Sequence, residues 1–92
     1  MKTVRGTLTK ILSLKYGNGT EYRRVTFKLA DGSWAKTDIC PKFRNYAAWR
    51  SLLKVGNILA NLELRDPRTV NADSHPRLVG REPQPDDQMK LL

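Results

Sequence analysis

Aromatic and basic side chains alternate along two short segments in the first half of the chain. They are Tyr22, Arg24, Thr26 and Lys28 in one segment, and Trp34 and Lys36 in the next. Residues two apart lie on the same face of a β-strand, so each segment can gather its set on one surface. Lysine and arginine bind phosphates with release of condensed counterions. Exposed aromatic rings stack on unpaired bases, which is worth about 1–3 kcal/mol per base. The pattern therefore indicates non-catalytic binding of a nucleic-acid strand.

A second interpretation stays open for some of these side chains. Trp34 could pack on the aliphatic stem of Lys28, or under a loop, as simple surface cover. Arg24 and Asp38 could form a surface ion pair worth roughly 0–1 kcal/mol. Trp49 belongs to an apolar helical pattern, so we expect it in the core rather than on a binding surface.

Residues that could support catalysis are isolated from one another. His75 and Cys40 are the single histidine and the single cysteine of the chain, and neither has a second metal ligand at a suitable spacing. A glycine-rich loop that opens a helix, as nucleotide phosphates require, is also missing from the sequence. We therefore expect no catalytic residue, no metal and no cofactor, and a protein that is not an enzyme.

Positive charge is concentrated in the first part of the chain. Residues 1–54 contain 12 Lys and Arg against 3 Asp and Glu, a net charge of +9. Residues 55–92 contain 5 against 6, a net charge of −1, which gives +8 for the whole chain. Such an excess favours an acidic partner, most often nucleic acid and less often a membrane or an acidic protein.

Length and composition are typical of one small globular domain. The 92 residues are 39% hydrophobic, and they contain neither an N-terminal apolar run nor a segment long enough to span a membrane. A lone Cys40 cannot form an internal disulfide, as is usual in a reducing compartment. We expect a cytoplasmic protein that does not bind membranes.

The segment from Thr3 to Tyr16 predicts a long, bent first strand. One parity of this segment consists of Val4, Gly6, Leu8, Lys10, Leu12 and Leu14. This parity is mostly apolar, but Lys10 and the neighbouring Ile11 disturb it, which indicates a bulge or a bend. Residues 17–19, Gly-Asn-Gly, then predict a hairpin turn.

The second and third strands, Tyr22 to Ala30 and Ser33 to Cys40, can be placed in register. A two-residue turn would set a lysine on the apolar face, whereas a three-residue loop with Gly32 in the left-handed position pairs Phe27 with Ala35. On the outer face, the second register sets Lys28 opposite Trp34, Thr26 opposite Lys36 and Arg24 opposite Asp38.

Beyond Pro41 the pattern predicts one helix and two more strands. The helix is expected from an N-cap at Asn45 to a stop at Gly56, with an apolar face formed by Ala48, Trp49, Leu52, Leu53 and Val55. The next segments are predicted as a strand from Ile58 to Leu64, a long loop from Asp66 to Pro76, and a short strand over Arg77, Leu78 and Val79. We expect the strand from Ile58 to turn Ala60, Leu62 and Leu64 to the same side, with Leu59 as an exception.

This order of elements resembles an OB-fold, the five-stranded Greek-key β-barrel with one α-helix between the third and fourth strands. The resemblance covers residues 3–80 and rests on element order; an SH3-like barrel is the nearest alternative. We expect an all-β domain over residues 1–80 and a flexible tail over residues 81–92, which contains two prolines and two adjacent aspartates.

Within the OB-fold group, the chain resembles small proteins that bind single-stranded nucleic acid, such as bacterial single-strand DNA-binding proteins. That resemblance implies binding of single-stranded nucleic acid on the second and third strands, with DNA favoured over RNA. The implied site consists of Tyr22, Arg24, Thr26, Lys28, Trp34 and Lys36, flanked by Lys15, Tyr16 and Arg68. The tail is also similar, in Asp86-Asp87 and Leu91-Leu92, which implies a possible protein partner there. The alternative function is an adaptor or inhibitor module that binds an acidic protein.

Overall fold

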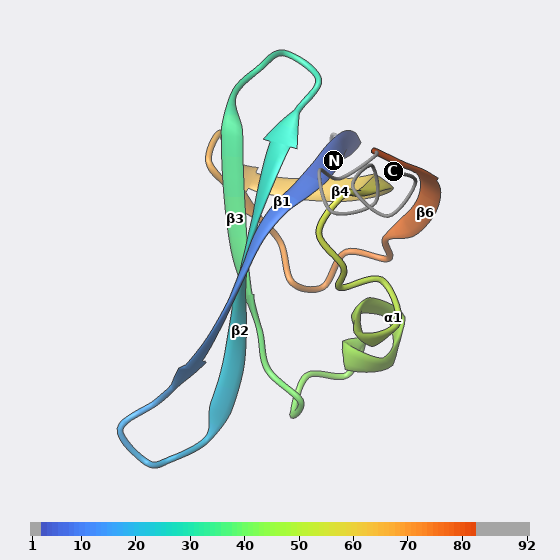
Figure 1. The fold of residues 1–92 in the computed structure, drawn as a ribbon. Coiled ribbons are helices and arrows are strands. Elements are labelled where there is room, and N and C mark those ends of the chain that lie inside the picture. The colour runs from blue at the N-terminus through green and yellow to red at the C-terminus, as the bar shows by residue number, and fades with distance from the viewer. Residues whose placement is uncertain (1–2, 83–92) are drawn as a thin grey trace, which may run out of the picture.

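The computed structural model describes residues 3–82, which form six strands and one short helix (Figure 1). The elements are β1 (Thr3–Lys15), β2 (Glu21–Leu29), β3 (Trp34–Ile39), α1 (Tyr46–Arg50), β4 (Asn57–Asp66), β5 (Thr69–Val70) and β6 (Arg77–Arg81). The described part of the chain is thus mostly β-structure, as the sequence pattern predicts.

Five of the strands form a ring. Their order is β1-β2-β3-β5-β4, and additional pairing between β1 and β4 closes the sheet. The β3–β5 pair is parallel, and the other pairs of the ring are antiparallel. β6 pairs with β4 outside this ring, and α1 lies on the path from β3 to β4 (Figure 1). The architecture is that of a small, barrel-like all-β fold.

β1 is long enough to belong to both sides of the barrel. Gly6 is opposite Leu29 of β2 and also opposite Leu59 of β4. A Cβ atom at Gly6 would lie 3.0 Å from the Cβ of Phe27, so this close approach of the strands requires glycine.

The predicted irregularity in β1 is confirmed, but its effect on parity was not foreseen. The register with β2 shifts between Leu8 and Lys10. Beyond the shift, Ile11 is opposite the buried Val25, whereas Leu12 is 39% exposed. The prediction that Leu12 continues the apolar row is therefore wrong, because one extra residue reverses which side chains face inward.

The predicted register between β2 and β3 is confirmed. Phe27 is opposite Ala35, Lys28 is opposite Trp34, and Gly32 has a φ of +87° in the connecting loop. Cys40, which strict alternation would place outward, is buried because β3 ends one residue earlier, at Ile39.

The helix is much shorter than predicted, since α1 ends at Arg50 rather than near Gly56. Asn45 is at the N-cap position, but its side chain makes no capping hydrogen bond there. After α1 the chain continues in tight turns, and the Asn57 side chain donates to the Leu52 carbonyl at 3.1 Å. The apolar residues after Arg50 thus pack against the core from irregular backbone, which their helical spacing did not reveal.

Trp49 confirms the prediction that it belongs to the core. It is fully buried, its ring centroid lies 6.2 Å from that of Phe27, and its indole N–H donates to the Ala72 carbonyl at 2.8 Å. The buried apolar cluster around it comprises Leu8, Val25, Phe27, Leu29, Ala35, Ile39, Trp49, Leu59, Leu62 and Val70.

β4 departs from simple alternation at Asn61, whose φ is +66°. This local left-handed conformation lets Leu59 and Leu62, three positions apart, both be fully buried. Asparagine tolerates that conformation better than most residues, and its side chain donates to the His75 carbonyl at 2.9 Å. Leu59 is therefore a core residue and not an exception to the core pattern.

The predicted loop from Asp66 to Pro76 contains the short strand β5, so this prediction is wrong in part. β5 has only two residues, too few to show an alternating pattern. β6 includes Arg81, which the sequence assigned to the tail, and the Glu82 amide donates to the Gly56 carbonyl at 2.7 Å. Asp86-Asp87 and Leu91-Leu92 lie outside the described residues.

Candidate nucleic-acid interface

The outward side chains of β1, β2 and β3 form one continuous surface, here called the outer face. It consists of Thr7, Lys10, Leu12, Leu14, Tyr22, Arg24, Thr26, Lys28, Trp34, Lys36 and Asp38, with Lys15 and Tyr16 at the β1–β2 turn. The strands fix these positions because residues opposite each other in an antiparallel pair point to the same side.

Trp34 and Lys28 form one end of the outer face. The Nζ atom of Lys28 lies 5.9 Å from the centroid of the Trp34 ring, within the range of a cation–π contact. Trp34 remains 53% exposed, the largest exposure among the large apolar side chains of the described residues. The contact with Lys28 therefore leaves much of the indole accessible for stacking.

A row of two lysines crosses the middle of the outer face. Lys10 and Lys36 are both opposite Thr26, on β1 and β3 respectively, and both are exposed. Sequence reasoning did not assign Lys10 to the site. Its disturbance of the apolar parity was the available signal, because the bulge turns Lys10 outward.

Arg24 and Asp38 form an ion pair beside this row. Arg24 Nε donates to Asp38 Oδ1 at 2.9 Å, and Arg24 Nη2 donates to Asp38 Oδ2 at 3.3 Å. These hydrogen bonds and the carboxylate charge raise the pKa of Arg24 above its ordinary value. The positive charge of Arg24 is thus largely balanced by its partner.

Two tyrosines form the other end of the outer face. The rings of Tyr16 and Tyr22 are stacked, with centroids 4.2 Å apart and planes inclined by 20°. Partial desolvation, together with the nearby Cys40 and Asp38, raises the pKa of Tyr16, so the phenol is uncharged at neutral pH. Lys15 is 4.0 Å from Glu21 in an exposed ion pair at the same end.

Arg68 lies near the Trp34 end and not beside the tyrosines. It belongs to the β4–β5 turn, where its amide donates to Asp66 Oδ1 at 2.9 Å and its carbonyl accepts from the Lys36 amide at 3.0 Å. The hydrogen bond from Arg68 lowers the pKa of Asp66, which is therefore ionised at neutral pH. Arg68 and Trp34 line the same groove.

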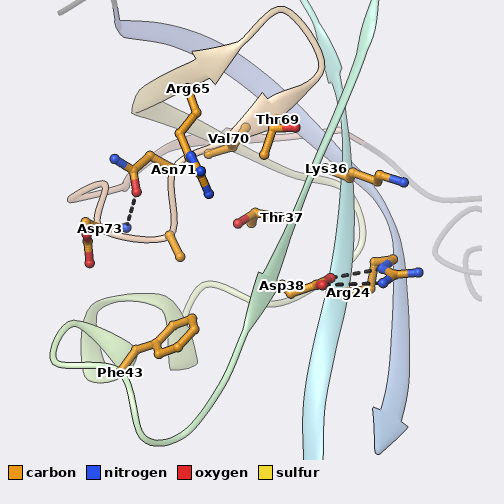
Figure 2. Close-up of a pocket in the computed structure, with 11 residues that line it drawn as sticks. Arg24, Lys36, Thr37, Asp38, Phe43, Arg65, Thr69, Val70, Asn71 and Asp73 are labelled. Carbon is orange, nitrogen blue, oxygen red and sulfur yellow. Dashed lines mark hydrogen bonds and ion pairs between the residues drawn. The ribbon is translucent and has the colours of Figure 1, made fainter. Parts of the chain in front are cut away.

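A hollow of about 430 Å³ continues the outer face past β3 (Figure 2). In Figure 2, Arg65 extends into the hollow from β4, Phe43 closes it from below, and the Lys36 side chain points away from it. Phe43 is 37% exposed. Sequence reasoning missed Arg65 and Phe43, because their proximity depends on the parallel pairing of β3 with β5.

The predicted site residues are thus gathered on one surface but divided between its two ends. Tyr22 and Lys28 are six positions apart on β2, a distance of about 20 Å at the usual rise of a strand. Trp34, Lys28 and Arg68 lie toward one end, Lys15, Tyr16 and Tyr22 lie at the other, and Lys36 lies between them opposite Thr26.

Residues 3–82 contain neither a cluster of metal ligands nor a membrane-spanning helix. That part of the chain has no group of three or more His, Cys, Asp or Glu side chains able to hold a metal ion. It also contains no helix of the length and apolar character needed to cross a membrane. The chain matches no protein-family model, no curated protein and no solved structure.

Proposed function

We propose that the barrel is an OB-fold and that its outer face binds single-stranded nucleic acid, DNA more than RNA, without catalysing a reaction. The observation that carries this proposal is the exposed indole of Trp34, held beside Lys28 and next to the Lys10–Thr26–Lys36 row. Phosphates contact the lysines, and an unpaired base stacks on the indole.

The dimensions of the outer face support binding of an extended strand. Aromatic side chains lie at both ends of the outer face, and cations lie between them. The two ends are about 20 Å apart along β2. A single OB-fold binds roughly 4–16 nucleotides, so a strand that contacts both ends falls within the usual range. The described ring order and the single helix between β3 and β4 support the OB-fold assignment.

The experiment is a titration of fluorescent single-stranded oligonucleotides of increasing length, with a duplex of equal length as the control. Stacking requires unpaired bases, so we expect the single strand to bind more tightly than the duplex, and affinity to rise with length until the outer face is covered. Equal affinity for both, with the same salt dependence, would reduce the protein to a nonspecific polycation.

A second candidate is a module that binds an acidic protein through the same basic surface, which the net charge of +8 favours. Steep salt dependence is expected for both functions and does not separate them. Affinity that depends on oligonucleotide length belongs only to the first function, so the same titration decides between the two.

A further inference from the structure

A large groove lies beside the Trp34 end of the outer face, between the β2–β3 loop and the β4–β5 turn. Its volume is about 910 Å³. It is lined by Val4, Leu29, Ala30, Asp31, Ser33, Trp34, Leu64, Asp66, Pro67 and Arg68, and is called the Trp34 groove below. Most of this lining is apolar, and the exposed indole forms part of it. A base that enters the groove can therefore stack on Trp34 while the rest of its strand stays on the outer face.

The charges of the Trp34 groove differ from those of the outer face. Two carboxylates, Asp31 and Asp66, are present against one guanidinium, that of Arg68. In a chain with a net charge of +8, this is a local excess of negative charge. Carboxylates do not bind phosphate, whereas the lysines of the adjoining outer face do. The groove is suited instead to the uncharged part of a nucleotide, the base, while the phosphates stay on Lys28 and Lys36.

The polar groups of the groove are fixed by the backbone around them. Asp31 Oδ1 accepts the Ser33 amide at 2.9 Å and also bonds the Ser33 hydroxyl. Asp66 Oδ1 accepts the Arg68 amide at 2.9 Å within the two-residue β4–β5 turn. The Thr69 hydroxyl and amide also bond the Asp66 carboxylate. An ionised carboxylate has about four acceptor sites, so two are open to a ligand once the Thr69 hydroxyl turns away.

We propose that the Trp34 groove binds one unpaired guanine, stacked on Trp34 and read by Asp66 and Arg68; this rests on the proposed function. Guanine presents acceptors at O6 and N7, which suit the guanidinium of Arg68. It presents donors at N1 and the 2-amino group, which suit the carboxylate of Asp66. The groove thus adds a base preference at one position to a surface that otherwise binds by stacking and charge.

The other bases fit this pair of groups less well. Thymine and uracil have one ring donor and no amino group, so they offer Asp66 a single hydrogen bond. Cytosine and adenine present an amino donor to a carboxylate but lack the neighbouring ring N–H that guanine has. Guanine alone can satisfy a carboxylate with two parallel bonds and a guanidinium at the same time.

The test measures binding of the full chain to a fluorescent oligo-dT of about twelve nucleotides, in which a single dG replaces dT at each position in turn. We expect one position, or one short window, at which dG raises the affinity roughly fivefold or more. Deoxyinosine at that position, which lacks the 2-amino group, should lose part of the gain. Asp66→Asn keeps a side-chain acceptor for the Arg68 amide and should abolish the preference for dG over dT at that position.

Asp31→Asn is the matched control, because it removes the same charge from the same groove. It should retain the guanine preference, because Asp66 and Arg68, not Asp31, make the proposed contacts with the base. Uniform affinity at every dG position, with oligo-dT still bound, would overturn the groove assignment and leave the proposed function intact. A preference that survives Asp66→Asn would overturn the role of Asp66. Absence of binding to any single strand would instead overturn the proposed function.

Discussion

At the scale of single residues, stacking and charge come from different side chains of the outer face. Trp34 supplies an exposed ring, Lys28 and Lys36 supply charge, and Arg24 is engaged by Asp38 through two hydrogen bonds. An exposed ion pair of this kind contributes roughly 0–1 kcal/mol to stability. Under the proposed function we expect a larger effect on binding, because the pair places a carboxylate among the cations that contact phosphates.

Replacing Asp38 by asparagine is therefore expected to strengthen binding of single-stranded nucleic acid. The change removes the negative charge and frees Arg24 for phosphate, so the plot of log affinity against log salt should steepen by up to roughly 0.7, the value for one phosphate contact on a single strand. The measurement is fluorescence anisotropy at several salt concentrations.

Glu63→Gln is the control for Asp38→Asn, because it changes the net charge equally at a residue of β4 that pairs with Thr3 and is not part of the outer face. It should alter affinity and slope much less. An equal gain in both variants would mean that only the net charge of the protein matters, and that Arg24 has no local role.

At the scale of the elements, sequence reasoning was most reliable where alternation and turn chemistry agreed. The β2–β3 register follows from apolar residues on one face and from the loop that ends at Gly32, and the structure bears it out. It failed where a single residue changes the parity, as at the bulge before Lys10 and at Asn61 in β4. Such irregularities depend on how the strands close into a barrel, which local pattern does not show.

The helix shows a second limit of local pattern. Apolar residues after Arg50 keep helical spacing, yet α1 has five residues. Beyond it the chain turns toward β4, and the side chain of Asn57 donates to the Leu52 carbonyl. For the same reason, sequence reasoning did not assign Lys10, Arg65 and Phe43 to the site. The position of Lys10 depends on the bulge in β1, and the positions of Arg65 and Phe43 depend on the parallel β3–β5 pair.

Gly56→Ala is expected to destabilise the protein, although α1 ends well before this residue. Gly56 is buried with a φ of +97°, and its amide donates to the Leu8 carbonyl at 2.7 Å. A Cβ in that left-handed conformation costs about 1–2 kcal/mol. Urea unfolding should show a loss of this size in the free energy of unfolding.

Gly17→Ala provides the comparison, since a Cβ at Gly17 would meet no atom within 4 Å. That variant should unfold close to the parent. If Gly56→Ala were equally neutral, the turn that leads into β4 would have a different backbone conformation from the one described.

At the scale of the whole molecule, β6 closes the described chain against β4 and does not belong to the ring. Arg81 is opposite Asn57, and the Glu82 amide donates to Gly56. These contacts tie the end of β6 to the turn that starts β4, so Arg81 and Glu82 belong to the folded domain.

A chain that ends at Glu82 is expected to keep its melting temperature within a few degrees. A chain that ends at Gly80 loses the Arg81 pairing and the Glu82 hydrogen bond, and a loss of about 1 kcal/mol would lower the melting temperature by roughly 4–8 °C. Thermal unfolding followed by circular dichroism measures both. A large decrease for the longer chain would show that residues 83–92 contribute to the fold.

We propose that the outer face binds single strands through two separable kinds of contact, stacking on Trp34 and charge on the lysines. The most direct measurement compares the parent with Trp34→Ala and Lys36→Ala, by oligonucleotide binding at several salt concentrations, with circular dichroism as a check on folding. Both variants should fold, because Trp34 and Lys36 are exposed. Lys36→Ala should weaken binding and flatten the log affinity–log salt plot by roughly 0.7. Trp34→Ala should cost about 1–3 kcal/mol of binding free energy with almost no change in slope. Folded variants that both bind like the parent would contradict the account.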